Sequence, residues 1–355
     1  MRVLQLIDTF DAGGAERMAI NIANALSEVE GVSSFLVATR RSGPLESNID
    51  EKVSYTILNK RKSVDIGFLQ RLRRFCADQN IEIIHAHSTS FFYAALVKMM
   101  RPKIKLVWHD HYGKSELLSE RKVGHLKRMS RYFDAVISVN EILMEWAREE
   151  LKCKQCFFLK NFVVLITSNA PFEPLKGKEG FRIVCMANLR PQKDHINLLK
   201  DYLSVKKRFP EASLHLLGKD FEDQYSEDIR NFIKDHRIKD VWILGSQKNI
   251  PALLDMATIG VLSSKSEGLP LALLEYGMQH LPVVVTNVGD CANVIQDNGQ
   301  LVSPGDPIEL AEAMQYYLED KTKRKSDAAL FHKRVVDNFS EHNFVKQLVK
   351  IYNSL

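Results

Sequence analysis

Two glutamates, Glu267 and Glu275, have the spacing in this sequence that is most informative about chemistry. Pro270 lies between them and suits the first position of a helix, because its φ is already helical and its missing N–H costs nothing there. We therefore expect Glu267 in the loop before a helix and Glu275 in its second turn, with the free N–H groups of the helix start nearby. Helix starts bind anions. The segment could thus hold the phosphates of a sugar nucleotide between two hydroxyl-binding carboxylates. Two solvated surface acids are the alternative that the spacing alone leaves open.

Basic and glycine residues follow other predicted strands. Arg190 and Lys193 come just after the strand predicted at residues 181–189, and cations at such a strand end suit a diphosphate. Gly13 and Gly14 lie where the first strand turns into the first helix, and paired glycines let backbone approach a phosphate closely. The turn is not a G-x-G-x-x-G fingerprint and no acid follows the second strand, so a nicotinamide dehydrogenase is disfavoured.

Two histidine clusters end two further strands of the first half. His85 and His87 are separated by one residue, and His109 and His111 flank Asp110 in the same way. A lone histidine is more often structural, but two clusters on one edge of a sheet favour a binding site. Metal binding by some of these side chains is an alternative. Hydrogen bonding to sugar hydroxyls fits the pattern better, and we expect no metal.

Short apolar, β-branched runs alternate with helical patterns along the chain, which is typical of an α/β fold with parallel sheets covered on both faces. In the first half we expect strands at residues 3–7, 35–38, 53–58, 81–87, 104–109 and 135–139, with a helix at 15–29. In the second half we expect strands at 181–189, 213–218, 241–245, 259–264 and 283–287.

The alternation predicts two Rossmann-like lobes that face a central cleft. We expect an N-terminal, acceptor-side domain at residues 1–165, a Pro- and Lys/Gly-rich linker at 166–180, and a nucleotide-sugar-binding domain at 181–335. A C-terminal helix at 336–355 is expected to pack back on the N-terminal domain. Ligands in such sheets bind outside the carboxyl ends of the strands, at topological switch points.

Composition narrows the class further. The chain has 355 residues, 45% hydrophobic and 26% charged, as in a soluble globular protein of two domains. There is no apolar run long enough for a membrane span and no signal peptide, and the five cysteines are odd in number and scattered, so we expect a cytoplasmic location.

The charge is uneven along the chain. The first 165 residues carry 25 Lys and Arg against 19 Asp and Glu, a balance of +6. The basic residues gather around 60–62, 71–74 and 121–131, interleaved with apolar residues such as Phe68 and Leu72. This pattern favours an anionic membrane surface or an anionic acceptor, and thus a peripheral position on the inner face of the plasma membrane. Ordinary solvated basic helices are the alternative. No nucleic-acid-binding motif accompanies the charge.

Taken together, these stretches resemble the retaining family-four glycosyltransferases of the GT-B fold, over nearly the whole chain. The resemblance rests on residues 13–17, 83–88 and 135–140, and most specifically on the E-x7-E segment 264–275 followed by 282–286. It implies a nucleotide-sugar donor, with a UDP-sugar favoured, held mainly by the second lobe, and an acceptor held by the first. Members of this kind need no metal and retain anomeric configuration.

The resemblance also implies roles for individual residues. Glu275 would bind the ribose hydroxyls, Glu267 would face the donor hexose, and Arg190 and Lys193 would neutralise the leaving diphosphate. The N–H groups of Gly268 and Leu269 would lie near the hexose or the β-phosphate. Gly14, on the opposite lobe, would meet the phosphates when the lobes close. His111, or as second choice His109, would lie near the sugar, and Glu16 on the acceptor side.

The chain departs from the family pattern at a few positions. Asn188 stands where many members have a phosphate-binding arginine, so Arg190 would substitute from a shifted position. The expected activity is a hexosyltransferase that uses a saccharide or lipid-linked acceptor in cell-surface polysaccharide synthesis. A sugar-nucleotide epimerase or hydrolase of the same fold, and a non-catalytic sugar-nucleotide-binding subunit, stay open as alternatives.

Overall fold

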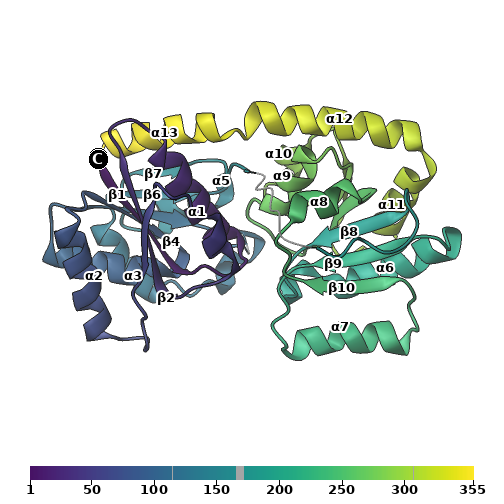
Figure 1. Ribbon diagram of the computed structural model, residues 1–355, viewed down its shortest axis with the longest axis horizontal. Helices are drawn as coiled ribbons and strands as arrows, with labels where there is room; N and C mark the ends of the chain where they lie inside the picture. The colour runs from purple at the N-terminus through teal and green to yellow at the C-terminus, as the bar shows by residue number, and fades with distance from the viewer. Residues whose placement is uncertain (114, 165–171, 307) are drawn as a thin grey trace. The chain divides into compact units, whose positions relative to one another are not determined.

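The computed structural model describes residues 1–113, 115–164, 172–306 and 308–355 and divides into two compact units (Figure 1). Unit 1 comprises Met1–Phe162 and Glu341–Leu355, and unit 2 comprises Val163–Ser340. The chain thus returns to unit 1 at Glu341, five residues after the start expected for the C-terminal segment. Residues 166–171 of the predicted linker lie outside the described residues, and residues 172–180 form neither helix nor strand.

Unit 1 is built on a seven-stranded parallel sheet of order β3-β2-β1-β4-β5-β6-β7. Its strands are β1 (Arg2–Thr9), β2 (Ser33–Arg41), β3 (Ser54–Ile57), β4 (Ile83–His87), β5 (Lys105–Asp110), β6 (Ala135–Ser138) and β7 (Cys156–Phe158). Its helices are α1 (Gly14–Ser27), α2 (Ile66–Asp78), α3 (Phe91–Met100), α4 (Gly124–Met129), α5 (Glu141–Glu150) and α13 (Glu341–Asn353).

Local sequence explains where these elements begin. The side chains of Asp65 and Asn140 cap α2 and α5 by accepting hydrogen bonds from the N–H groups of Phe68 and Leu143. All five residues of β4 are buried, as expected for a central parallel strand covered on both faces. Helix α13 packs beside α1, and Figure 1 shows it in yellow at the end of the chain.

Unit 2 repeats the design with a six-stranded parallel sheet of order β10-β9-β8-β11-β12-β13. Its strands are β8 (Arg182–Met186), β9 (Ser213–Leu217), β10 (Val241–Gly245), β11 (Ile259–Leu262), β12 (Val283–Thr286) and β13 (Gln300–Val302). Its helices are α6 (His195–Arg208), α7 (Gln224–Asp235), α8 (Ile250–Asp255), α9 (Leu271–Met278), α10 (Cys291–Ile295), α11 (Glu309–Glu319) and α12 (Lys321–Asn338).

The predicted α/β class and its eleven strands are confirmed, with strand ends within three residues of those expected. The three-residue strands β7 and β13 were not expected, because such short edge strands carry too few apolar residues to show a pattern. In both sheets the strand order reverses beside the first strand, between β1 and β4 and between β8 and β11. These are the switch points at which α/β sheets bind ligands. Within the described residues, none of the helices combines the length and apolarity that a membrane crossing needs.

Candidate functional site

The site residues predicted from the sequence fall into two groups, one in each unit, and each group is described by itself. In unit 2 the central feature is an ion pair. The Nζ atom of Lys193 lies 2.5 Å from Oε1 and 2.7 Å from Oε2 of Glu267, and the Ser264 hydroxyl donates to Oε1 at 2.6 Å. The Glu267 side chain is 5% exposed and that of Lys193 is 20% exposed. A carboxylate this buried is stable as an anion only with such partners.

Two loops at the switch point of unit 2 carry this pair. Lys193 ends a short 3-10 helix, Pro191–Lys193, that follows β8, and Glu267 follows β11. The loops are joined because the Lys265 N–H donates to the Gln192 carbonyl at 2.8 Å and the Ser263 hydroxyl donates to the Lys193 carbonyl at 2.9 Å. The sheet therefore fixes both ends of the ion pair.

Backbone packing holds the segment after Glu267 in place. Gly289 has a φ of +56°, and a Cβ there would lie 2.4 Å from the Glu267 carbonyl oxygen and 2.5 Å from that of Gly268. The Asp290 N–H donates to the Gly268 carbonyl at 2.9 Å. The Leu269 side chain is buried, which anchors this loop to the core. Only glycine fits at position 289.

Helix α9 begins one residue later than the sequence predicts. Pro270 is its N-cap rather than its first helical residue, since its ψ of 119° is extended and its carbonyl accepts the first helical hydrogen bond, from Leu273. The prediction of helical geometry at Pro270 was wrong because a φ near −70° fits the cap as well as the first turn. Glu275 lies in the second turn of α9, as expected, and is 4% exposed.

The neighbouring cation, Arg190, is exposed, and its guanidinium lies over the Phe221 ring at 4.3 Å. Asn188 does not point its amide oxygen outward, because that oxygen accepts a hydrogen bond from the Lys219 N–H at 2.7 Å. The structure thus brings Lys193 and Glu267 into direct contact and holds Arg190 on an aromatic ring beside the same strand end.

In unit 1 the four predicted histidines form one stack, the histidine tetrad, made of His85, His87, His109 and the partly exposed His111. Neighbouring ring centroids lie 4.1–5.4 Å apart. The tetrad forms because β4 and β5 are in register, with His87 beside His109, and side chains two residues apart share a face. His85, His87 and His109 are fully buried.

Hydrogen bonds join the tetrad to two residues that the sequence analysis missed. Nε2 of His87 lies 2.8 Å from Oε1 of Gln5 on β1, and Nδ1 of His85 lies 2.6 Å from the hydroxyl of Tyr352 on α13. Gln5 could have been found from the register of neighbouring strands. Tyr352 could not, because it is 267 residues from His85 and no local pattern marks it.

Burial keeps all four rings neutral. It lowers the pKa of His85 and of His111 to about 3, and it lowers the pKa values of His87 and His109 well below the usual range for histidine. Nearby histidines add to the effect on His85, His87 and His109. At neutral pH each ring therefore has one N–H donor and one lone pair.

The tetrad is also the place in the described residues where a metal could be considered. One ring nitrogen from each of His85, His87 and His109 lies within 4.8 Å of the others. Five of the six ring nitrogens of these three histidines are, however, engaged with one another, with His111, with Gln5 or with Tyr352 through hydrogen bonds of 2.6–3.1 Å, and Nε2 of His109 is buried without a partner in the described chain. A metal would have to replace those bonds in a fully buried position.

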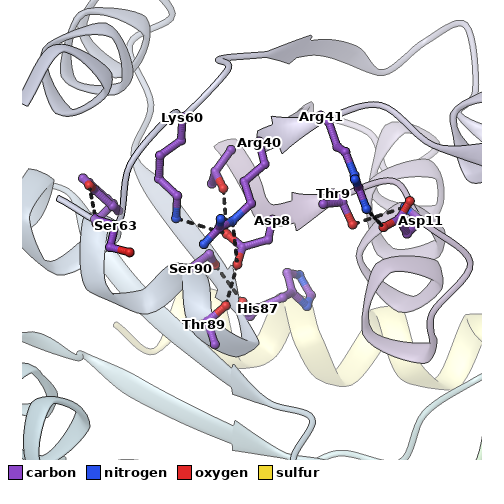
Figure 2. A network of polar contacts seen from close by, with 12 residues as sticks. Asp8, Thr9, Asp11, Arg40, Arg41, Lys60, Ser63, His87, Thr89 and Ser90 are labelled. Atoms are coloured by element: carbon purple, nitrogen blue, oxygen red, sulfur yellow. Dashed lines mark hydrogen bonds and ion pairs between the residues drawn. The ribbon is translucent and has the colours of Figure 1, made fainter. Parts of the chain in front are cut away.

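A second polar network lies at the carboxyl ends of β1 and β2 (Figure 2). The Asp8 carboxylate accepts hydrogen bonds from the Thr39 and Thr89 hydroxyls, both at 2.6 Å, and lies 3.7 Å from the Arg40 and Lys60 side chains. Burial alone raises the pKa of the Asp8 carboxyl, but these hydrogen bonds and charges together hold it below its usual value. The network ties the end of β1, just before the loop that follows it, to the neighbouring strands.

That loop leads to the glycine pair. Gly13 is the N-cap of α1, and a Cβ there would lie 2.2 Å from Oε2 of Glu16. A Cβ at Gly14 would meet no atom of the described residues within 4 Å. The Glu16 side chain thus lies close to Gly13, whereas Gly14 faces open space, and the approach of this backbone to a phosphate stays a prediction.

The basic segments differ from the amphipathic surface that the sequence suggested. Phe68 and Leu72 are buried in the core of unit 1. Arg121 is 9% exposed, makes a two-pronged ion pair with Asp110 at 2.7 and 2.8 Å, and packs on the Trp146 ring at 4.1 Å. Arg121 is thus not available to an anionic surface. The basic residues that remain exposed include Arg73, Arg74, Lys122, Lys127, Arg128 and Arg131.

Glycosyltransferase family models match both halves of the chain. Residues 12–165 match the family model described as glycosyltransferase family 4, and residues 167–329 match the model described as glycosyl transferases group 1. The chain is 23% identical over 319 residues to an uncharacterised glycosyltransferase of Haemophilus influenzae, covering 87% of this chain and 88% of the relative.

A second sequence relative and a solved structure have more specific names. The chain is 22% identical to a UDP-Gal:α-D-GlcNAc-diphosphoundecaprenol α-1,3-galactosyltransferase of Escherichia coli, covering 88% of this chain and 86% of that protein. The crystal structure of Anabaena HepE in complex with UDP-glucose superposes with a TM-score of 0.85 at 17% identity, covering 100% of both chains. At that identity the likeness to HepE shows the fold.

Proposed function

The chain belongs to the family-four, group 1 glycosyltransferases of the GT-B fold, and on that premise we propose that it is a retaining hexosyltransferase that uses a UDP-sugar. The acceptor in this proposal is a saccharide or a lipid-linked saccharide, and the product contributes to a cell-surface polysaccharide. The E. coli relative is named for a UDP-galactose donor and a diphosphoundecaprenol acceptor, and HepE was crystallised with UDP-glucose.

The observation that supports this proposal best is the ion pair of Lys193 and Glu267 at the switch point of unit 2. Both oxygens of Glu267 are engaged by Lys193, and one also accepts from Ser264. A carboxylate held in this way suits fixed hydrogen bonding to a sugar better than proton transfer or nucleophilic attack. Its role in the proposal is to orient the hexose.

The other roles follow from position. Lys193, with Arg190 beside it, stabilises the negative charge that develops on the leaving diphosphate. Glu275, in the second turn of α9, binds the ribose hydroxyls, and Gly268 and Leu269 supply backbone N–H groups. In unit 1 we assign His111, or as second choice His109, to a hydroxyl of the donor sugar. Gly13 and Gly14 are assigned to the phosphates, and Glu16 to the acceptor.

Calorimetric titration with UDP-, GDP- and ADP-glucose tests the donor. We expect that UDP-glucose alone binds, or that it binds at least tenfold more tightly than GDP- and ADP-glucose. A preference for another base would refute the UDP assignment. Transfer is then followed with that donor and a diphosphate-linked acceptor, with the anomeric configuration of the product read by NMR. An inverted product would refute the retaining mechanism.

Variants separate the site from the alternatives. Lys193→Ala and Glu275→Ala should each abolish sugar transfer while the circular dichroism spectrum stays native, and undiminished transfer in both would refute the site assignment. Turnover of the donor without acceptor would identify an epimerase or hydrolase. Tight donor binding with no turnover, in the presence of every acceptor tried, would identify a binding subunit.

We also propose that the enzyme works on the cytoplasmic leaflet and binds it through exposed basic residues of unit 1, among them Arg73, Arg74, Lys127 and Arg128. Vesicles of phosphatidylcholine with and without phosphatidylglycerol test this. Cosedimentation with the anionic vesicles alone is expected, and it should weaken as salt is raised. Equal binding to both kinds of vesicle would contradict the proposal.

A further inference from the structure

The hydrogen bonds around the histidine tetrad take their direction from the orientation of one amide, that of Gln5. Gln5, on β1, is paired in register with His85 on β4, and its amide reaches His87 on the same face of the sheet. An amide oxygen can only accept a hydrogen bond. Nε2 of His87, 2.8 Å from Oε1 of Gln5, must therefore carry the proton.

The direction then passes to His111. Because the His87 ring is buried and neutral, a proton on Nε2 leaves a lone pair on Nδ1. Nδ1 of His87 lies 2.9 Å from Nε2 of His111, so His111 must donate from Nε2. His111 is neutral as well, and its Nδ1 is left as a lone pair that no hydrogen bond of the described residues uses.

We propose that Gln5 is a positioning residue that acts through His87 to hold His111 in its Nε2–H form, with Nδ1 presented as an acceptor for a hydroxyl group. That the hydroxyl belongs to the donor sugar rests on the proposed function; the tautomer itself does not. His111 of this form accepts a hydrogen bond from a sugar hydroxyl, whereas the other tautomer would offer a donor at the same place.

A second branch from the same amide reaches the C-terminal helix. Nε2 of Gln5 donates to the Tyr352 hydroxyl at 3.4 Å, and that hydroxyl donates to Nδ1 of His85 at 2.6 Å. His85 in turn donates from Nε2 to Nδ1 of His109 at 3.1 Å. In this direction the last donor of the branch is Nε2 of His109, which is buried without a partner in the described chain.

The two branches are coupled because one amide serves both. Its oxygen faces His87 and its NH2 group faces Tyr352, so turning the amide around would reverse the protons along both branches and convert His111 into a donor at Nδ1. Tyr352 is 4% exposed and Gln5 is fully buried, so water does not compete for these positions. The orientation of Gln5 therefore sets what His111 offers a ligand.

The tautomers are measured directly by long-range 1H–15N spectra of the full-length protein labelled with 15N-histidine. The His111 signal is assigned by its loss in His111→Ala. Wild type should show His111 and His87 as neutral Nε2–H forms at neutral pH. Gln5→Met should convert His111 to a mixture of tautomers, whereas Ser34→Ala, which removes a buried hydroxyl from β2, should leave His111 unchanged.

Ligand binding supplies the functional readout, with UDP-glucose and UDP as probes. Gln5→Met should weaken UDP-glucose by about 3- to 10-fold, the value of one hydrogen bond, and leave UDP unchanged. Gln5→Glu should restore both the tautomer and the affinity, because a carboxylate also accepts from His87. The Glu variant keeps the test available if Gln5→Met does not fold.

Several outcomes would overturn the proposal. One is an Nδ1–H form of His111 in wild type, and another is a Gln5→Met variant with the wild-type tautomer and UDP-glucose affinity. Stoichiometric binding of added Zn2+ with loss of the tetrad signals would also overturn it, since a metal needs the same lone pairs. If wild type binds neither UDP nor UDP-glucose, the proposed donor is wrong, and the spectra alone decide the positioning role.

Discussion

Replacing Lys193 by methionine tests the ion pair at the centre of unit 2. The substitution keeps the length of the side chain and removes its charge, so the Glu267 carboxylate, 5% exposed, loses its lysine partner and keeps the hydrogen bond from the Ser264 hydroxyl. Removal of one partner of a buried ion pair costs about 3–5 kcal/mol. Because Lys193 is one-fifth exposed and Ser264 remains, we expect a cost near the lower end of that range.

Thermal unfolding measures this cost. For a unit of this size about 3 kcal/mol corresponds to a Tm roughly 6–12 °C lower. Lys265→Met is the matched control, because Lys265 comes from the same loop, is 59% exposed and pairs with Asp194 at 3.1 Å. The Asp194 side chain is 8% exposed, but the lysine end of this pair lies in solvent, so we expect a cost of about 1 kcal/mol and a Tm change of at most a few degrees.

A double variant separates charge pairing from packing. Lys193→Met combined with Glu267→Gln removes both charges, so it should recover more than about 1 kcal/mol of what Lys193→Met loses. UDP affinity should fall about 10- to 100-fold in Lys193→Met, because a charged hydrogen bond to phosphate is worth about that much. In Lys265→Met the affinity for UDP should not change. Equal, small losses of stability in Lys193→Met and Lys265→Met, with unchanged UDP affinity in both, would refute the reasoning.

Four further results are expected. Burial lowers the pKa of His85 to about 3, so below about pH 6.5 this side chain takes up a proton in the unfolded chain but not in the folded one. The free energy of unfolding therefore falls by about 1.4 kcal/mol per pH unit as pH is lowered. His85→Gln should flatten this pH dependence of the free energy of unfolding, measured with urea. Arg121→Met should cost about 3–5 kcal/mol in unfolding experiments, because it leaves the buried Asp110 carboxylate unpaired. Gly289→Ala should lower Tm and donor affinity together, since its Cβ would press on the carbonyl of Glu267. Glu267→Gln should abolish transfer yet bind UDP at least as tightly as wild type by calorimetry, because it removes a negative charge near the diphosphate.

Matched variants make these results specific. Lys127→Met breaks an exposed pair with Glu150 and should cost less than about 1 kcal/mol. Gly305→Ala has a φ of +74° but open space around its Cβ, so it measures backbone strain without the clash at Gly289. If Gly305→Ala reduced donor affinity as much as Gly289→Ala, the explanation from the Glu267 carbonyl would be wrong.

Much of the fold could be predicted because the information is local. A buried parallel strand such as β12 is a short, nearly continuous apolar run, and the residues after it then fall at the carboxyl edge of the sheet. The same pattern puts Lys193 and Glu267 after the carboxyl ends of two strands of one sheet. Their direct contact was not predicted, because it depends on two loops joined through Lys265 and Gln192.

The rest required tertiary information. The sequence predicts Arg121 as part of a basic surface because its charge is visible there, whereas its partner Asp110 and the ring of Trp146 are brought to it by the fold. The link between Gln5 and Tyr352 spans nearly the whole chain. In physical terms, local pattern encodes burial and strand ends, and it does not encode which buried polar groups will satisfy one another.

The ion pair also explains how a lysine already bound to a carboxylate can serve a diphosphate. An ammonium group has three N–H donors, and Glu267 takes two of them through its two oxygens. The third is left for a phosphate oxygen, so Lys193 need not release Glu267 when the ligand enters. The lysine would then lie between two anions and reduce their repulsion. Glu267 in turn keeps the flexible lysine side chain in one position, which lowers the entropy lost on binding. In the proposed reaction the pair would therefore work as a unit.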